Sequence, residues 1–163
     1  MPGTKPPIES HRGCRIVDGE RNGSRALKAP DGRSKVAFGV DARKDGTEKL
    51  YVVKHAGEFC YVGRTGTSVP TRIQGGLNAR YPYGWRRHSR VDLHVCFLGR
   101  TSDYRFGEGV EAELVHLIRL GTGQRPGKWP SDQNEIHFRH NKGLPDPERV
   151  KAARDIYRVL AKA

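Results

Sequence analysis

Five side chains between positions 51 and 113 have the types that hydrolysis of a phosphodiester bond uses: Tyr51, Tyr61, Arg64, Arg72 and Glu113. That reaction needs an activated water, a cation opposite the charge that develops at phosphorus, and usually a metal ion. A tyrosine orients or deprotonates water if cations lower its pKa, and arginines hold the oxygens around the phosphorus. A single glutamate is enough to anchor a hard divalent ion such as Mg²⁺ or Mn²⁺.

Each of these residues also has an ordinary structural explanation. Tyrosine is common in strands, arginine on a helix is often only solvated, and glutamate is usually exposed. Glu111 lies on the same predicted helix as Glu113 and competes with it for a metal, although it points away from Leu114 and Leu117. The order of the motifs, rather than any single residue, therefore carries the prediction.

The two tyrosines lie on predicted paired strands over residues 50–53 and 59–62, which are rich in β-branched and aromatic residues. Residues 55–57 have the length and the glycine of a hairpin loop. With this three-residue loop, Tyr51 lies opposite Tyr61, and both hydroxyl groups share one face of the sheet. A loop one residue longer or shorter would change that pairing.

A short helix is predicted after the second strand. Ser68 is a favourable N-cap, and the helix extends to about Gln74, where the glycines at 75–76 end it. Arg72 then lies in the middle of the helix, close in sequence to the strand that carries the second tyrosine.

Further elements complete a small domain. Residues 91–98 alternate well enough for a third strand, and residues 108–120 carry an apolar stripe at helical spacing. Glu113 lies on the border of that stripe, where a carboxylate can look into a groove beside the sheet. A C-terminal helix opens at Asp146 and packs on the rest.

These elements predict a domain that combines three strands with helices. Residues 35–163 are expected to form one domain, in which residues 35–40 make a first edge strand or a lead-in segment. Residues 1–34 contain scattered Gly, Pro and Arg without periodicity, so they are predicted to be a flexible basic arm.

The motif order resembles the signature of the GIY-YIG nucleases. The motifs are Leu50-Tyr51 and, after nine residues, Tyr61-Val62-Gly63-Arg64. A downstream arginine, a third strand and a glutamate-bearing helix follow in that family's order. The resemblance covers about residues 49–140. It implies an α/β (α+β) fold, with a small three-stranded antiparallel sheet flanked by helices, and a metal-dependent endonuclease that cleaves DNA.

The resemblance also implies roles for single residues. Tyr51 and Tyr61 would be the motif tyrosines, one of them the group that activates water. Arg64 stands where many members have lysine, Arg72 would bind the phosphate, and Glu113 would be the single metal ligand. Which tyrosine is the base stays open.

Some positions depart from the family pattern. Lys49 replaces the first motif's glycine, and the asparagine that usually follows the glutamate helix is Asn134 or Asn141. His88 and His94 are further accessory candidates, either to replace a tyrosine or to serve as the base, because some members use histidine near the arginine. The departures motivate an alternative, a catalytically inactive GIY-YIG-like module that binds nucleic acid. A third interpretation is a regulatory protein whose basic surface binds acidic proteins.

The positive net charge indicates a polyanionic partner, and DNA is the partner that we expect. The formal net charge is +12, and residues 50–100 carry the densest excess, 8 Lys/Arg against 2 Asp/Glu. Residues 78–90 mix aromatic residues with arginines, a composition suited to stacking on bases and contacting phosphates. The expected nucleic-acid contacts are Arg80, Tyr83, Trp85, Arg86, Arg87 and Arg90. Alternatively, Trp85 pins this loop to the core.

Composition also sets expectations about location. No apolar run opens the chain and no segment reaches membrane-spanning length, so a cytoplasmic protein without a membrane partner is predicted. Three cysteines without paired spacing argue against structural zinc, and Cys60 and Cys96 fit core positions. Sequence specificity and oligomeric state are not predicted.

Overall fold

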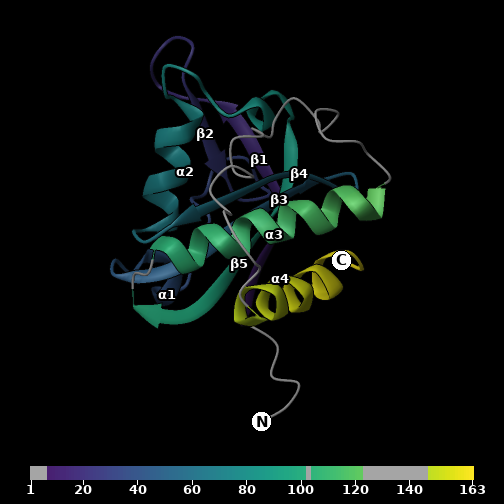
Figure 1. The fold of residues 1–163 in the computed structure, drawn as a ribbon. Helices are drawn as coiled ribbons and strands as arrows, with labels where there is room; N and C mark the ends of the chain where they lie inside the picture. The colour runs from purple at the N-terminus through teal and green to yellow at the C-terminus, as the bar shows by residue number, and fades with distance from the viewer. Residues whose placement is uncertain (1–6, 102–103, 123–146) are drawn as a thin grey trace.

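The computed structural model describes residues 7–101, 104–122 and 147–163. Figure 1 shows the elements in chain order. They are β1 (Ile8–Asp18), β2 (Arg25–Lys28), α1 (Val40–Arg43), β3 (Thr47–His55), β4 (Glu58–Thr65), α2 (Val69–Leu77), the 3-10 helix η1 (Gly84–Arg87), β5 (Arg90–Thr101), α3 (Tyr104–Thr122) and α4 (Pro147–Leu160).

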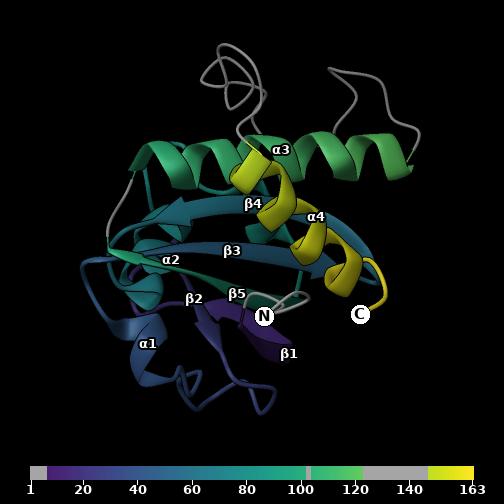
Figure 2. The same ribbon diagram turned by 60° about the horizontal axis from the view of Figure 1, so that its bottom comes forward.

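One antiparallel sheet organises the molecule, with strand order β2-β1-β5-β3-β4. Helices α3 and α4 cover one face of the sheet, and α1 and α2 lie on the other (Figure 2). Strand β3 runs near the centre, so seven consecutive residues, 48–54, are buried. A strand covered on both faces reads as a continuous buried run rather than as an alternation.

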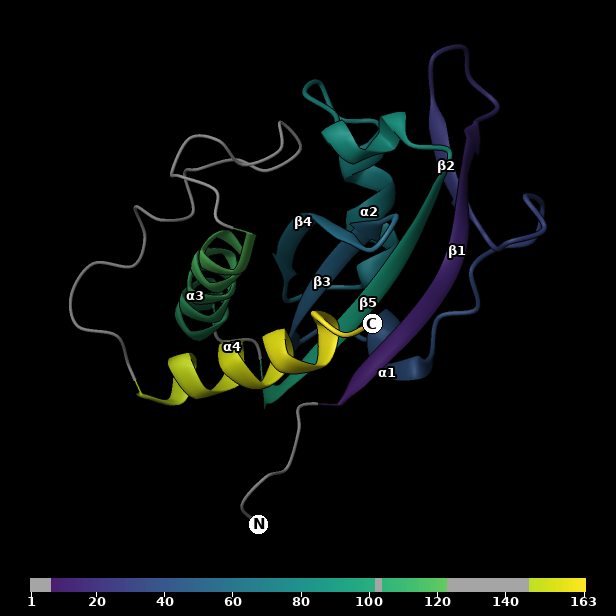
Figure 3. The same cartoon turned by 90° about the vertical axis from the view of Figure 1, so that its right-hand side faces the viewer.

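The sheet has five strands where the sequence predicted three. Residues 8–28 form β1 and β2, so the prediction of a flexible arm is wrong for this segment (Figure 3). Cys14 and Ile16 alternate into the core, and the carboxylate of Asp92 accepts a hydrogen bond from the Gly13 backbone at 2.8 Å. That bond holds an irregular stretch of β1 against β5.

The predicted edge strand at residues 35–40 does not form. Lys35 makes only an isolated bridge to Lys28, and α1 begins at Val40. Helix α2 also differs from its prediction, because it continues through Gly75 and Gly76 to Leu77. Packing of its apolar face outweighs the low helix propensity of the two glycines.

The β3–β4 hairpin keeps both tyrosines on one face, as predicted, but Tyr51 does not lie opposite Tyr61. Its loop has two residues, Ala56 and Gly57, both with positive φ, rather than three. An irregularity at Cys60 adds one residue to β4, so Tyr61 pairs with Val53 and Gly63 with Tyr51. Residues two apart share a face, so the bulge returns both tyrosines to the same side.

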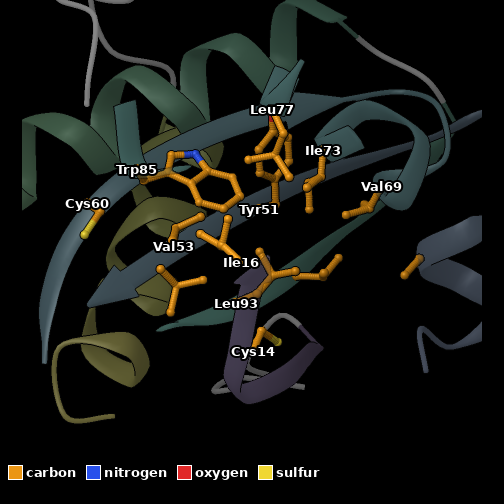
Figure 4. Packing of buried hydrophobic residues seen from close by; sticks show 13 residues of the cluster. Cys14, Ile16, Tyr51, Val53, Cys60, Val69, Ile73, Leu77, Trp85 and Leu93 are labelled. Atoms are coloured by element: carbon orange, nitrogen blue, oxygen red, sulfur yellow. The ribbon is translucent and has the colours of Figure 1, made fainter. Parts of the chain in front are cut away.

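Two apolar clusters lie on the two faces of the sheet. The α2 side contains Tyr51, Val53, Ile73, Leu77 and Trp85 (Figure 4). The α3–α4 side combines residues of β3, β4 and β5 with both helices. Trp85 is fully buried, so it pins its loop to the core and is not available to stack on a base.

The cysteines are structural. All three are buried and none forms a disulfide. Burial raises the pKa of the Cys14 thiol to about 11 and that of Cys96 to about 12, so both remain protonated at neutral pH. Within the described residues, no helix has the length and apolar character to cross a membrane.

His94 is the buried histidine of β5, on the face opposite Tyr51. Its Nδ1 lies 2.7 Å from the hydroxyl of Ser10, and its Nε2 has no hydrogen-bond partner among the described residues. Burial, followed by the positive charges of Arg12 and Lys54, lowers its pKa to about 4. The fold therefore holds a neutral imidazole.

We expect this histidine to destabilise the fold in acid. Below pH 6.5 this histidine is protonated in the unfolded chain but stays neutral in the folded chain. The free energy of unfolding therefore decreases by roughly 3 kcal/mol as the pH falls from 6.5 towards 4. Urea unfolding at several pH values should show a shallower decline for His94→Leu than for the natural protein. Parallel curves would contradict a buried neutral His94.

Candidate active site

A hollow of about 340 Å³ collects four of the five residues that the sequence predicted to be catalytic. It lies where the ends of β3 and β4 meet α2 and α3. Its lining includes Tyr51, Tyr61, Gly63, Arg64, Thr65, Gly66, Thr67, Arg72, Glu108 and Glu111. Both predicted tyrosines and both predicted arginines are therefore brought together from three separate elements, β3, β4 and α2.

Tyr51 and Tyr61 line the hollow, and Tyr83 packs against both rings from outside its lining. The hydroxyl groups of Tyr51 and Tyr83 are 2.7 Å apart, a hydrogen-bond distance. The rings of Tyr51 and Tyr61 stack with centroids 5.9 Å apart, and Tyr83 lies 4.7 Å from Tyr61. Tyr51 is fully buried, whereas Tyr61 and Tyr83 keep part of their surface exposed.

Glycines make room for these rings. A Cβ at Gly63 would collide with the ring and hydroxyl of Tyr51, its cross-strand partner. A Cβ at Gly76 would collide with the ring of Tyr83. The glycine that follows Tyr61-Val62 is thus required by the packing of the first tyrosine, which gives the motif spacing a steric reason.

The environment keeps the tyrosines protonated. Burial is the main cause that raises the pKa of Tyr51 and Tyr61 well above that of free tyrosine, and the neighbouring hydroxyls add to it. Glu111 raises the pKa of Tyr61 further, whereas Arg72 acts in the opposite direction on Tyr51. Both side chains therefore enter any reaction at neutral pH as phenols, not as phenolates.

Arg72 is the cation on the α2 side of the hollow. Burial opposes its charge, but the hydroxyls of Tyr51, Tyr83 and Tyr61 outweigh burial, and the pKa of Arg72 is raised. The guanidinium stays charged and presents a fixed set of donors.

Arg64 differs from Arg72 because it forms an ion pair with a glutamate. Its Nη1 donates to the Oε1 of Glu48 at 2.6 Å, and the Glu48 side chain is completely buried. Gly107 of α3 lies against the same Glu48 carboxylate, so no larger residue fits there. The Glu48–Arg64 pair therefore joins β3 and β4 to α3 beside the hollow.

The carboxylates of the hollow are Glu108 and Glu111, not the predicted Glu113. Glu111 lies one turn beyond Gly107, which faces Glu48 on the sheet. Glu113 lies one turn beyond Gly109, which packs against Arg149 of α4. The apolar stripe did not show which glutamate faces the hollow. Helix α3 packs against both the sheet and α4, so its buried residues mark more than one side of the helix.

The acidic side of the hollow fits a lightly coordinated divalent ion. Across the described residues, no group of three or more His, Cys, Asp and Glu side chains has the arrangement of a metal site. Mg²⁺ often binds through one or two carboxylates together with water and substrate phosphate, rather than in a protein cage. Glu111, which is buried, and Glu108 provide that kind of donor set.

The remaining predicted residues lie elsewhere. His88 stacks on His55 with ring centroids 4.0 Å apart, outside the hollow. Arg86 donates to the carbonyl groups of Leu77 and Gly23 and ties its loop to the fold. Arg80, Arg87 and Arg90 are exposed, and Asn134 and Asn141 fall outside the described residues.

Sequence analysis did not identify Glu48, Glu108 or the role of Tyr83 as the hydrogen-bond partner of Tyr51 beside the hollow. Tyr83 could have been found from Gly76, since a second glycine within a helix signals a close neighbour. Glu48 and Glu108 carry no spacing signal of their own.

Two glycine substitutions should have opposite effects on stability. Gly63→Ala forces a methyl group into the ring of Tyr51 and should destabilise the fold by about 1–3 kcal/mol. Gly75→Ala meets open space on α2 and should stabilise the fold by up to about 1 kcal/mol. Chemical denaturation of both variants checks the signs; equal effects would contradict the packing of Tyr51 on Gly63.

Comparisons with known proteins leave the family of this chain open. No family model, no curated protein and no solved structure matches the chain. Its function has to follow from its own residues and their geometry.

Proposed function

We propose that the chain is a metal-dependent DNA endonuclease of the GIY-YIG type. The observation that carries the proposal is the meeting of Tyr51, Tyr61, Arg72 and Glu111 in one small hollow. Phosphodiester hydrolysis uses groups of these kinds: hydroxyls that orient water, a permanently charged guanidinium and a carboxylate that can bind a metal ion. In the reaction, a water oxygen bonds to phosphorus, the bond to the 3′ oxygen breaks, and the product carries a 5′-phosphate.

Arg72 would hold the scissile phosphate. Its raised pKa keeps it charged, and its planar donors match two phosphate oxygens at once. Arg64 contributes positive charge on the other side, but its ion pair with Glu48 makes it mainly a positioning residue.

Glu111 would bind a divalent ion, with Glu108 beside it. A phosphate entering the hollow meets both carboxylates, so a bound cation would remove an unfavourable interaction between like charges. When bound, Mg²⁺ or Mn²⁺ would polarise the phosphate and lower the pKa of a coordinated water.

Tyr61 is the better of the two tyrosines for orienting water. It retains exposed surface and lies close enough to Glu111 for the carboxylate to affect its pKa. The hydroxyl of Tyr51 is fully buried and bonded to that of Tyr83. We assign Tyr61 to the water and Tyr51 to positioning Arg72 and the wall of the hollow.

An inactive nucleic-acid-binding module is the second candidate. It is favoured by Lys49, which replaces the motif glycine and whose ammonium group is fully occupied by the carbonyls of Lys44 and Thr47 and the Thr47 hydroxyl. Both candidates require binding driven by phosphate contacts, which weakens steeply as salt is added.

Cleavage of supercoiled plasmid separates these candidates. With Mg²⁺ or Mn²⁺ we expect nicking or linearisation by the natural protein and none in EDTA. Glu111→Gln should reduce the rate at least about a hundredfold, because it removes the proposed anchor of the ion.

The matched control is Glu113→Gln, the same chemical change two residues away on the α4 side of the helix. It should leave the rate close to that of the natural protein. Loss of activity in Glu113→Gln but not in Glu111→Gln would reverse the assignment of the carboxylate. Salt-sensitive binding without cleavage in either ion would leave the binding module as the function, and absence of both would reject the two candidates together.

A further inference from the structure

A groove of about 940 Å³ lies beside α2 and shares no lining residue with the candidate active site. It is bounded by β2, residues 35–38 and the face of α2 turned away from the active site. Its interior is apolar, with Leu27, Val36, Phe38, Pro70 and Ile73 among the lining residues. The volume falls within the usual range for sites that bind organic ligands.

Three cations, Lys28, Lys35 and Arg43, also line this groove. None of them makes an ion pair with an acidic side chain in the described part of the chain. Apolar interior and unneutralised positive charge together suit a ligand with flat apolar groups on a polyanionic backbone.

The walls of the groove are fixed to each other. Gln74 Nε2 donates to the Arg25 carbonyl at 2.9 Å, and Asn78 bonds both the backbone N–H and the carbonyl of the same residue. These bonds hold β2 against the C-terminal part of α2. The groove is therefore preformed, because hydrogen bonds fix the positions of the two elements that bound it.

Gly75 lacks the packing reason that other helical glycines have. A Cβ at Gly76, Gly107, Gly109 or Gly121 would collide with a neighbouring side chain, whereas at Gly75 it would meet nothing within 4 Å. An exposed helical glycine without such a neighbour lowers stability relative to alanine. Such a position is used where a ligand approaches the backbone closely.

Gly75 lies where the groove continues to the active site. A middle hollow of about 390 Å³ shares Thr71 and Gly75 with the groove, and it shares Thr67 and Arg72 with the active-site hollow. The same middle hollow is lined by Tyr81, whose side chain is 82% exposed. An exposed aromatic ring is a stacking platform for a base.

We infer that an unpaired stretch of the DNA strand runs from the active site past Tyr81 and Gly75 into the groove, where Lys28, Lys35 and Arg43 face its phosphates. The inference rests on the proposed function. In a duplex the bases are stacked inside and the phosphates lie at the surface, so an apolar groove would contribute little to the binding of duplex DNA. Unpaired bases bury their faces in such a groove, and the protein therefore prefers DNA with a single-stranded extension.

Fluorescence anisotropy in EDTA tests this preference without requiring cleavage. The probes are a short labelled duplex and the same duplex with a single-stranded extension on its 3′ or 5′ end. The natural protein should bind one extended probe roughly tenfold more tightly than the plain duplex, the gain expected from stacking about one base.

Two variants interrupt the path in different ways. Gly75→Leu fills the junction between the hollows while improving the helix, so it should raise the melting temperature and remove the preference for the extension. The double change Lys35→Glu with Arg43→Glu should also remove it. The control is Arg154→Glu with Lys162→Glu, which makes the same change in net charge at exposed positions at the C-terminal end.

The outcomes distinguish this inference from the proposed function. The control should weaken binding to all probes equally and keep the preference for the extended probe. Equal binding of extended and plain duplex by the natural protein, or a preference that survives in both groove variants, would overturn the inference while leaving plasmid cleavage intact. Failure to bind any probe, together with failure to cleave plasmid, would reject both.

Discussion

The packing of Tyr51 on Gly63 is the constraint on which the site depends. A fully buried tyrosine needs space for its ring and a partner for its hydroxyl. Gly63 gives the space on the neighbouring strand, and Tyr83 gives the partner at 2.7 Å. Because Tyr83 comes from the loop before β5, that single hydrogen bond draws the loop over the hollow, where Trp85 then packs into the core.

This arrangement also decides the chemistry that the hollow offers. Clustered hydroxyls in a buried setting hold on to their protons, whereas Arg72 keeps its charge beside them. The tyrosine hydroxyls can donate and accept hydrogen bonds and can orient a water molecule, but they are poor bases at neutral pH. In the proposed reaction, charge would come from Arg72 and from a cation bound at Glu111, on the α2 and α3 sides of the hollow.

Local patterns were sufficient to predict β3, β4, β5, α2, α3 and α4, because alternation and helical spacing depend on near neighbours, but they did not predict the short helices α1 and η1. They could not reveal the bulge at Cys60, which offset an error in the predicted loop length and kept Tyr51 and Tyr61 on one face. They also failed for β1, whose pairing depends on residues such as Asp92 far along the chain. The choice between Glu111 and Glu113 required knowing that α4 covers one side of α3.

The N-terminal strands change where the positive charge lies. Along the sequence the excess is densest between residues 50 and 100, whereas in space Lys28 and Lys35 of the N-terminal segment lie beside α2. Strands β1 and β2 extend the sheet away from α3, and the hydrogen bonds from Gln74 and Asn78 bring β2 back to α2 (Figure 3). The added strands therefore do more than lengthen the sheet. They bring Lys28 to the groove beside α2, whereas Glu108 and Glu111 line the hollow on the α3 side, so the DNA path proposed above would run from Arg72 towards positive charge.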